Sequence, residues 1–256
     1  MLRRRKGLVA VCAAVGTAAT GFIVQQVLTA GERAFSSTGA PLQVRIITDL
    51  ALFRSSAAYV PAFVVPRSIA DIGPPPNRYA ADPSNPQEPP ADDPARYSWA
   101  HRLGGVDADQ TLVRLSISGT SSSATVLQQL RVRVLQCGPP LTGTDVSYRG
   151  LGDGIGVRYF FVVLDQSLPT VVYSWPDLRA NGNQPFPLRV TNSIQEEFDV
   201  VGQVNHSDCD WELLLDWTQG TRNGTLTLSN DGKPLETTAS SSPGVSEATW
   251  NPRQQR

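Results

Sequence analysis

Hydrophobic and polar residues alternate most clearly in the stretch 209–229. Every second residue from Trp211 to Trp217 is a tryptophan or a leucine, which is typical of a β-strand with one face in a hydrophobic core. A polar turn is expected at 218–224, where Asn223-Gly224 is the dipeptide best able to adopt positive φ. A return strand follows, and Asn230-Asp231-Gly232 closes the next turn. The pattern predicts a β-meander that organises the fold.

The same kind of pattern predicts further strands along the chain, at 43–50, 58–65, 111–118, 126–136, 155–165, 170–173, 186–191 and 197–204. Pro61 interrupts the second of these, so we expect it at a sheet edge. The stretch 155–165 is apolar on both faces and is expected to be central. Many short strands separated by Gly, Pro and Asn favour a mainly β fold, an Ig-like β-sandwich ectodomain, which we place at 95–238.

Three other segments differ from this pattern. The stretch 95–103 is the one plausible soluble helix, with Gly104-Gly105 ending it. Residues 73–94 contain eight prolines among 22 residues and predict an extended, polar loop or linker. The final residues, 239–256, are expected to form a flexible tail.

The N-terminus predicts a membrane anchor. Residues 1–6 carry four consecutive basic side chains, and 7–28 contain no charged residue. A helix of about 22 residues is roughly 33 Å long, enough to cross a bilayer, and the basic flank stays in the cytoplasm. A cleaved signal peptide is the alternative, although the small-residue cleavage site at Ala30 is a poor match. Residues 29–72 would then form a stalk and edge strands outside the membrane.

The charge distribution excludes one class of partner. The chain has 22 basic and 23 acidic residues, but four of the basic ones lie in the N-terminal tail, which leaves 18 against 23, or −5, for the rest. This body has no basic stripe, so we expect no nucleic-acid partner.

The three cysteines separate into one within the apolar segment and two beyond it. Cys12 is expected to be inert in an apolar helix. Cys137 and Cys209 lie at strand ends in an oxidising compartment, so we expect a disulfide between them. Two buried free thiols are the alternative, and a metal site lacks the usual four ligands.

Candidate chemistry is sparse. The chain lacks the nucleophile elbow, the P-loop and the zinc-protease motif, and it has only two histidines, His101 and His206. His206-Ser207-Asp208 resembles a catalytic triad only as a string of letters, because triads assemble in space. The acidic runs 107–109 and 208–212 offer calcium-type oxygen ligands, but each is too short to form a site alone. We therefore predict no catalytic, cofactor-binding or metal-binding residues and no cofactor.

Several motifs resemble a group of uncharacterised actinobacterial proteins whose C-terminal β-sandwich-like domain follows variable N-termini, some membrane-spanning and some helix-turn-helix. The resemblance covers about 97–238 and rests on 99–109, 111–119, Leu130-Arg-Val-Arg-Val134, Gly143-Thr144, Phe186-Pro187, 209–217, Gly224-Thr225 and Asn230-Asp-Gly-Lys-Pro234. The resemblance implies a module that occurs behind different N-termini, which set its location in the cell. It implies no catalytic residue.

These observations predict a single-pass protein of a bacterial cell membrane, with its N-terminus in the cytoplasm and its C-terminal domain outside. It would bind or scaffold an envelope protein or glycan. The alternatives are an exported hydrolase or transferase with a site assembled from scattered Asp, Ser and His residues, and an accessory subunit of a membrane complex. An enzyme site would require a histidine in a deep pocket beside a carboxylate and a hydroxyl.

Overall fold

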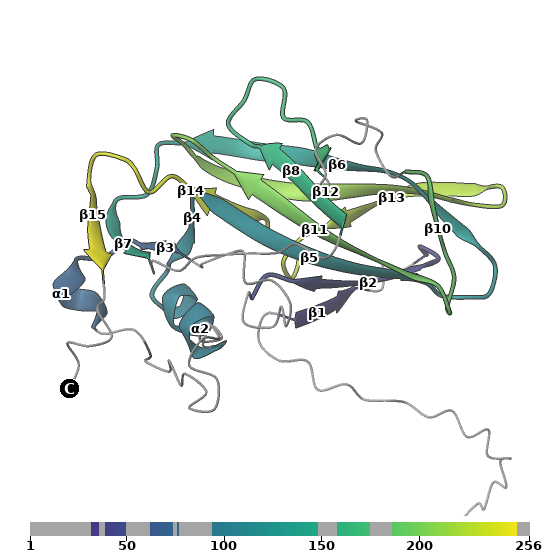
Figure 1. The fold of residues 1–256 in the computed structure, drawn as a ribbon, viewed down its shortest axis with the longest axis horizontal. Coiled ribbons are helices and arrows are strands. Elements are labelled where there is room, and N and C mark those ends of the chain that lie inside the picture. Colours follow the sequence, from purple (N-terminus) through teal and green to yellow (C-terminus); the bar gives the residue numbers. More distant parts are fainter. Residues whose placement is uncertain are drawn as a thin grey trace, which may run out of the picture.

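The computed structural model describes residues 32–35, 39–49, 62–73, 76, 94–147, 158–174 and 186–249. Within them the chain is mainly β, with two short helices (Figure 1). The helices are α1 (Ile69–Ile72) and α2 (Pro94–Arg102). The strands are β1 (Glu32–Phe35), β2 (Leu42–Ile47), β3 (Phe63–Val65), β4 (Val106–Ala108), β5 (Gln110–Gly119), β6 (Thr125–Gly138), β7 (Gly143–Ser147), β8 (Arg158–Val163), β9 (Val172–Ser174), β10 (Leu188–Val190), β11 (Gln195–Gln203), β12 (Asp208–Gln219), β13 (Arg222–Leu228), β14 (Leu235–Thr238) and β15 (Val245–Thr249).

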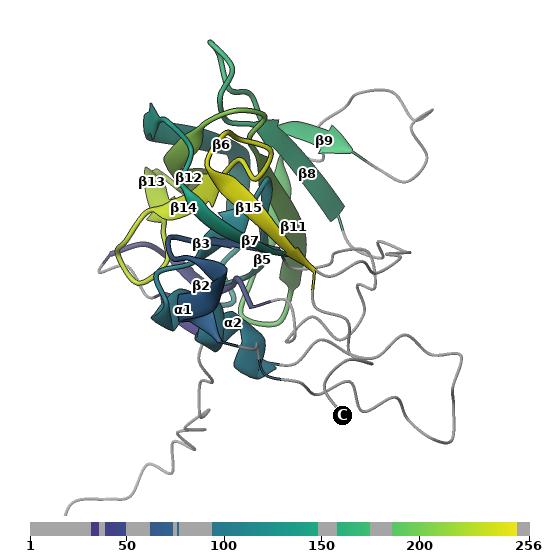
Figure 2. The same cartoon turned by 90° about the vertical axis from the view of Figure 1, so that its left-hand side faces the viewer.

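The strands form two sheets that pack as a sandwich. The 6-stranded sheet has the order β1-β2-β5-β11-β8-β9, and the 9-stranded sheet has the order β10-β6-β12-β14-β4-β3-β7-β15, with β13 also paired to β12. Figure 2 shows the two layers edge-on, with β8, β9 and β11 in one and β6, β12 and β13 in the other. The expected β-sandwich class is therefore confirmed.

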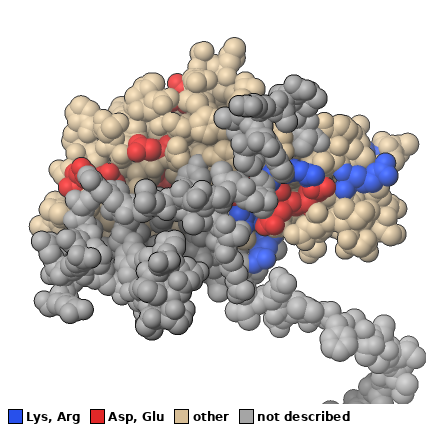
Figure 3. Space-filling view, in the orientation of Figure 1, with Lys and Arg blue, Asp and Glu red and all other residues tan. Residues whose placement is uncertain are grey.

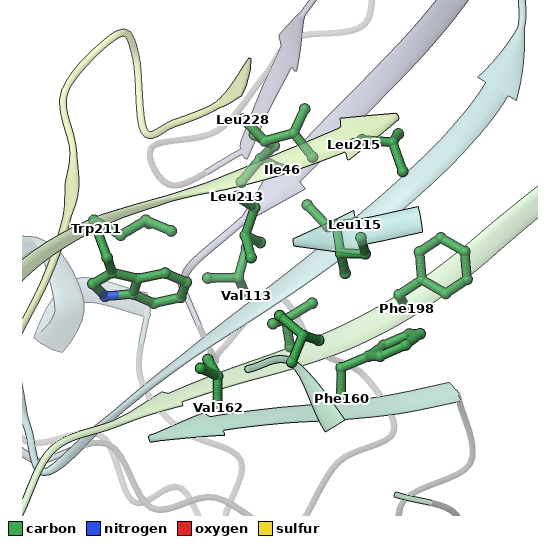
Figure 4. Packing of buried hydrophobic residues seen from close by; sticks show 14 of the residues in the cluster. Ile46, Val113, Leu115, Phe160, Val162, Phe198, Trp211, Leu213, Leu215 and Leu228 are labelled. Atoms are coloured by element: carbon green, nitrogen blue, oxygen red, sulfur yellow. The ribbon is translucent and has the colours of Figure 1, made fainter. Parts of the chain in front are cut away.

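The core lies between the sheets because the alternating apolar residues of each point toward the other (Figure 4). The 9-stranded sheet contributes Trp211, Leu213 and Leu215, all completely buried. Phe160 and Phe198 face them from the 6-stranded sheet, with their ring centroids 5.5 Å apart in an edge-to-face arrangement. The two-residue period read from the sequence is thus the physical origin of the inward face.

The turn of the hairpin between β12 and β13 is shorter than the predicted range 218–224 and lies within it. Pairing continues to Gln219↔Arg222, so the turn residues are Gly220 and Thr221, with Gly220 at φ 59°. Gly224 lies inside β13, opposite Trp217, where a Cβ would be 2.9 Å from the indole ring. The chain therefore turns within the predicted range 218–224, but Asn223 and Gly224 belong to the return strand, where Gly224 provides space for an aromatic ring.

The next turn follows the sequence prediction. Asn230 and Lys233 form an antiparallel bridge, and the residues between them, Asp231 and Gly232, have φ of 57° and 74°. Two consecutive positive φ angles are the signature of a type I′ turn, for which Asp-Gly is a preferred pair. Helix α2 also forms where expected, and Gly104, at φ 80°, follows its end.

The position of β3 is a correction to the sequence analysis. This strand begins at Phe63, after the proline, and pairs with β4 on one side and β7 on the other. It is therefore interior rather than at a sheet edge, and Pro61 lies outside the described residues.

Strand β15 lies inside the range 239–256 for which the sequence predicted a flexible tail. Residues Val245 to Thr249 pair in parallel with β7, and Ala248 is buried. This parallel pairing joins segments about 100 residues apart and leaves little local signal in a stretch rich in Ser.

The predicted disulfide is present and joins two neighbouring strands. Cys137 of β6 and Cys209 of β12 are directly opposite in the antiparallel register, with their Cα atoms 4.2 Å apart. In immunoglobulin domains the disulfide connects the two sheets instead, so the common feature with that fold is the sandwich of two β-sheets.

Across the described ranges no helix is long and apolar enough to span a membrane, and the predicted anchor at 7–28 lies outside them.

Candidate functional site

The two acidic runs noted in the sequence lie close together at one end of the sandwich. Strand β14 lies between β12 and β4, so Asp208 is paired with Thr238, and Thr237 is paired with Asp107. The end is covered by α2, below β4 in the view of Figure 1. Sequence reasoning flagged both runs but had no means of placing them together, because β4 and β14 are joined only in the folded sheet.

The register divides the carboxylates between the two faces of the sheet. Cys209, Thr237 and Asp107 are neighbours across three strands, and paired residues of adjacent strands project to the same face. Cys209 and Thr237 are completely buried, so Asp107 shares the inner face with them. Asp210 and Glu236 are also directly paired, and they project to the opposite, outer face.

Hydroxyl groups on the inner face form a connected hydrogen-bond network. The indole Nε1 of Trp211 donates to Thr237 Oγ1 at 3.0 Å, and the hydroxyls of Thr237 and Thr111 are 2.7 Å apart. Thr111 also donates to the backbone carbonyl of Glu236 at 3.0 Å. The network joins β5 of one sheet to β12 and β14 of the other, and it satisfies polar atoms that would otherwise be buried without partners.

His101 and Asp107 are the closest histidine and carboxylate on this inner face. Their nearest atoms, Nε2 and Oδ1, are 3.9 Å apart, too far for a hydrogen bond. The His101 ring lies 4.1 Å from the Tyr97 ring and 5.8 Å from the Phe63 ring, between ring centroids. An enzymatic dyad requires a direct bond that fixes the imidazole tautomer, and this pair has none.

Desolvation sets the protonation of this pair. The pKa of Asp107 is raised to about 7, chiefly by desolvation and in part by the charges of Glu236 and Asp49, while a side-chain hydrogen bond with Thr111 acts in the opposite direction. Desolvation lowers the pKa of His101 to about 4, although 38% of its side chain is exposed. Between these two pH values both groups are uncharged, so the pair is not an ion pair there.

The outer face carries the remaining carboxylates. Glu236 is paired with Asp210, and its pKa is raised to about 7 by partial desolvation and then by Asp208 and Asp210. Because the Glu236 side chain is exposed, water screens this interaction and its effect on stability is smaller than that of Asp107. Gln136 donates to Asp210 at 2.7 Å, which partly compensates the cluster of negative charge.

The second histidine lies elsewhere on the surface. The His206 side chain is 73% exposed, with Nδ1 3.2 Å from Asp165 Oδ2. Asp165 also accepts the backbone N–H groups of Asn205 and His206, at 2.8 and 2.9 Å. Asp165 thus ties the loop after β8 to the loop before β12. His206 thus lies on the surface and the described His101–Asp107 pair has no direct hydrogen bond, so we base no proposal on either histidine.

Asp109 holds the end of β14 in place through its hydrogen bonds. It adopts positive φ, 62°, which is uncommon for a residue with a side chain. Its carboxylate accepts the backbone N–H and the hydroxyl of Ser240, each at 2.7 Å, and its own N–H donates to the Thr238 carbonyl at 2.7 Å. These bonds fix the exit of β14, so both carboxylate oxygens are used within the protein.

Sequence reasoning missed a buried ion pair on the outward side of the 6-stranded sheet. Arg114 of β5 donates to both oxygens of Asp199 on β11, at 2.7 and 2.8 Å, and Glu197 lies 3.6 Å from the same guanidinium. Both partners are almost fully buried, beside an apolar cluster that includes Leu112 and Val201. Figure 3 shows acidic and basic side chains adjacent to one another on this side of the molecule. A signal was available in Arg114, which is the one charged residue of the otherwise uncharged strand β5.

In the part of the chain that the structure describes, no group of three or more His, Cys, Asp or Glu side chains is arranged to hold a metal ion. The comparisons give no functional lead: no protein-family model, no curated protein and no solved structure matches the chain. The resemblance to actinobacterial proteins stays a prediction. The described end of the sandwich carries carboxyl groups, among them Asp107 and Glu236, whose pKa values are raised chiefly by desolvation.

Proposed function

We propose that the chain is a membrane-anchored, extracytoplasmic module that binds or scaffolds a component of a bacterial cell envelope, an envelope protein or glycan. In this proposal the segment 7–28 crosses the membrane, residues 1–6 stay in the cytoplasm and the Ig-like sandwich lies outside. The proposal needs no cofactor and no nucleic-acid partner.

The observation that carries the proposal is the disulfide between Cys137 and Cys209, with a sulfur–sulfur distance of 2.03 Å. Structural disulfides persist in oxidising compartments and are rare in the reducing cytosol. The Cys209 side chain is completely buried and packs in the core, which supports a structural role. An exported location is the simplest environment for such a bond.

The solvent-facing side of β6 and β12 supports a scaffold rather than a catalyst. Arg131 donates to both oxygens of Asp216 at 2.8 Å, and Arg133 donates to Glu212. These cross-strand pairs balance positive against negative charge along the two longest strands, so this face has no concentrated field to attract a polyanion.

Thiol counting tests the compartment. The chain has three cysteines, and the proposal predicts that the protein, denatured without reductant, reacts with one maleimide–polyethylene glycol, at Cys12. After reduction it reacts with three. Reaction of all three before reduction, in protein taken directly from its native host, contradicts the proposal.

Location and partner need separate experiments. A C-terminal tag is expected to be cut by protease added to intact spheroplasts, and an N-terminal tag is expected to be protected. Chemical crosslinking in native membranes, followed by purification of the tagged chain, identifies the envelope component. Purification from detergent with a stoichiometric membrane protein favours the accessory-subunit alternative, and recovery of the intact chain in the cytosolic fraction rules the proposal out.

A further inference from the structure

One three-residue strand connects two parts of the 9-stranded sheet. Strand β4 lies between β14 and β3 in the sheet order. It is paired with β14 only through Asp107↔Thr237 and Ala108↔Thr238, and with β3 only through two further pairs. By comparison, β6 and β12 share eleven register pairs. The β4 connection is therefore the narrowest part of this sheet among the described strands.

The parts on either side of β4 have separate hydrophobic cores. The large core lies between the two sheets, and a smaller cluster is formed by buried residues of β3, β7, α1 and α2: Phe63, Val65, Ile72, Ala100 and Val146. We call β3, β7, β15, α1 and α2 the lobe. Figure 2 shows β3, β7 and β15 in front of the main sandwich, with the helices below them. A separate core at a narrow connection permits local opening without global unfolding.

Asp107 is the titratable group at this connection, and its side chain is only 15% exposed. The polar groups that act on it come from each neighbouring element: Thr111 on β5, Asp49 after β2 and His101 on α2, together with Glu236 of β14, whose charge acts from the outer face of the sheet. Strand β3 contributes Phe63, which is apolar. Among these described neighbours only His101 can carry positive charge, and desolvation lowers the pKa of His101 to about 4.

A second carboxyl group has the same character within the lobe. Asp145 of β7 is the register partner of Glu247 on β15, so two like charges are side by side. Desolvation raises the pKa of Asp145 to about 6, and Asp109 and Glu247 contribute to the same direction. Protonation of Asp107 therefore stabilises the β4 connection, and protonation of Asp145 stabilises the pairing of β7 with β15.

We propose that the β4 connection is a pH-controlled latch: the lobe stays docked while Asp107 is protonated, and it opens more often once Asp107 is ionised. An ionised Asp107 in the docked lobe is close to Glu236 and Asp49 in a poorly solvated position, whereas opening returns it to water. The docked lobe gains its full stability below the ordinary pKa of an aspartic acid. This stability decreases as the pH rises through the raised pKa and changes little above it.

Hydrogen exchange of the full chain between pH 5 and pH 8, corrected for the pH dependence of the chemical exchange step, tests the latch. For a pKa shifted from 3.8 to about 7, the opening equilibrium of the lobe is expected to rise up to about 100-fold across this range. Peptides covering β3, β7 and β15 are expected to lose protection, while peptides covering β12 serve as an internal reference. An equal change in β12, or no change in the lobe, contradicts the proposal.

Two variants separate the latch from a general effect of pH. Asp107→Asn is neutral at every pH and is expected to keep the lobe protected at pH 8, with most of the pH dependence lost. Asp71→Asn changes an exposed carboxyl group on α1 in the same lobe and is expected to retain the wild-type profile. An Asp107→Asn profile that follows the wild type overturns the proposal. If Asp107→Asn does not fold, the hydrogen exchange of the wild type between pH 5 and pH 8 decides: an equal change in β12, or no change in the lobe, contradicts the proposal.

Discussion

The indole ring of Trp211 in β12 lies against the backbone of Gly202 in β11, on the opposite sheet. A Cβ atom at Gly202 would lie 2.5 Å from Cζ2 of that ring, closer than any stable contact. The same ring donates its N–H to Thr237, so it has little freedom to move away. The separation between the two sheets at this point is thus set by a glycine facing a fixed tryptophan.

We expect Gly202→Ala to lower the free energy of unfolding by about 1–3 kcal/mol, because the methyl group over-packs the core. Urea unfolding followed by tryptophan fluorescence measures the change. Gly138→Ala is the matched control, since a Cβ there meets nothing within 4 Å. Equal stability of the two variants contradicts the role of Gly202.

Removal of the disulfide is expected to cost about 4 kcal/mol. Cys137 and Cys209 are 72 residues apart, and the chain-entropy model assigns a stabilisation of this size to a loop of that length. The paired substitution to alanine is to be compared with the wild type by urea unfolding under non-reducing conditions. With dithiothreitol present, the difference between the two proteins is expected to shrink to a small remainder. A difference of the same size with and without reductant contradicts this explanation.

Because Arg114 and Asp199 form a buried ion pair, we expect the effects of substituting them on the free energy of unfolding to be strongly non-additive. Replacing either residue alone by leucine leaves an uncompensated buried charge and is expected to destabilise the fold by about 3–5 kcal/mol. Replacing both is expected to cost much less than the sum of the two single changes. A double-mutant cycle from urea unfolding measures the coupling, and additive effects contradict it.

Asp165 is expected to contribute to the free energy of unfolding with a pH dependence opposite to that of Asp107. Desolvation raises its pKa, but the backbone N–H donors of Asn205 and His206 outweigh this and hold the pKa below its usual value. The carboxylate therefore stabilises the fold above the unfolded pKa of about 4, and this stability is lost as the pH falls through the lowered folded pKa.

We expect Asp165→Asn to lower the free energy of unfolding by about 1–3 kcal/mol at pH 7, because charge-assisted bonds to two backbone N–H groups are weakened. The difference from the wild type is expected to decrease as the solution becomes strongly acidic. Unfolding curves between pH 2 and pH 7 test this, and a difference that is independent of pH contradicts the role of the carboxylate.

The periodic stretches were predictable because their cause is local. The alternation from Trp211 to Trp217 gives β12 its buried face, and the Asp231-Gly232 pair gives the type I′ turn. The position of the first turn was not predictable in the same way. Gly224 has the chemistry of a turn residue, and only its contact with Trp217 shows that it serves packing.

The candidate site was predictable only as a set of fragments. The sequence identified Asp107, Asp208, Asp210 and His101 as polar groups that merited attention. Their division between two faces depends on the register of β14 against β12, about 30 residues away in the sequence, and against β4, about 130 residues away. The buried pair of Arg114 and Asp199 likewise depends on the pairing of β5 with β11.

The sequence by itself determined the two-sheet class, the strands with one apolar face, helix α2 and the one cysteine pairing available to the body of the chain. Periodicity, proline and glycine placement and cysteine count are properties of neighbouring residues, so they can be read without the fold. Only the tertiary structure decided which strands lie side by side, where the polar groups of β4, β5, β12 and β14 meet, and that Asp107 lies at the narrow connection to the lobe. These depend on contacts between distant segments, whose free energies no local pattern records.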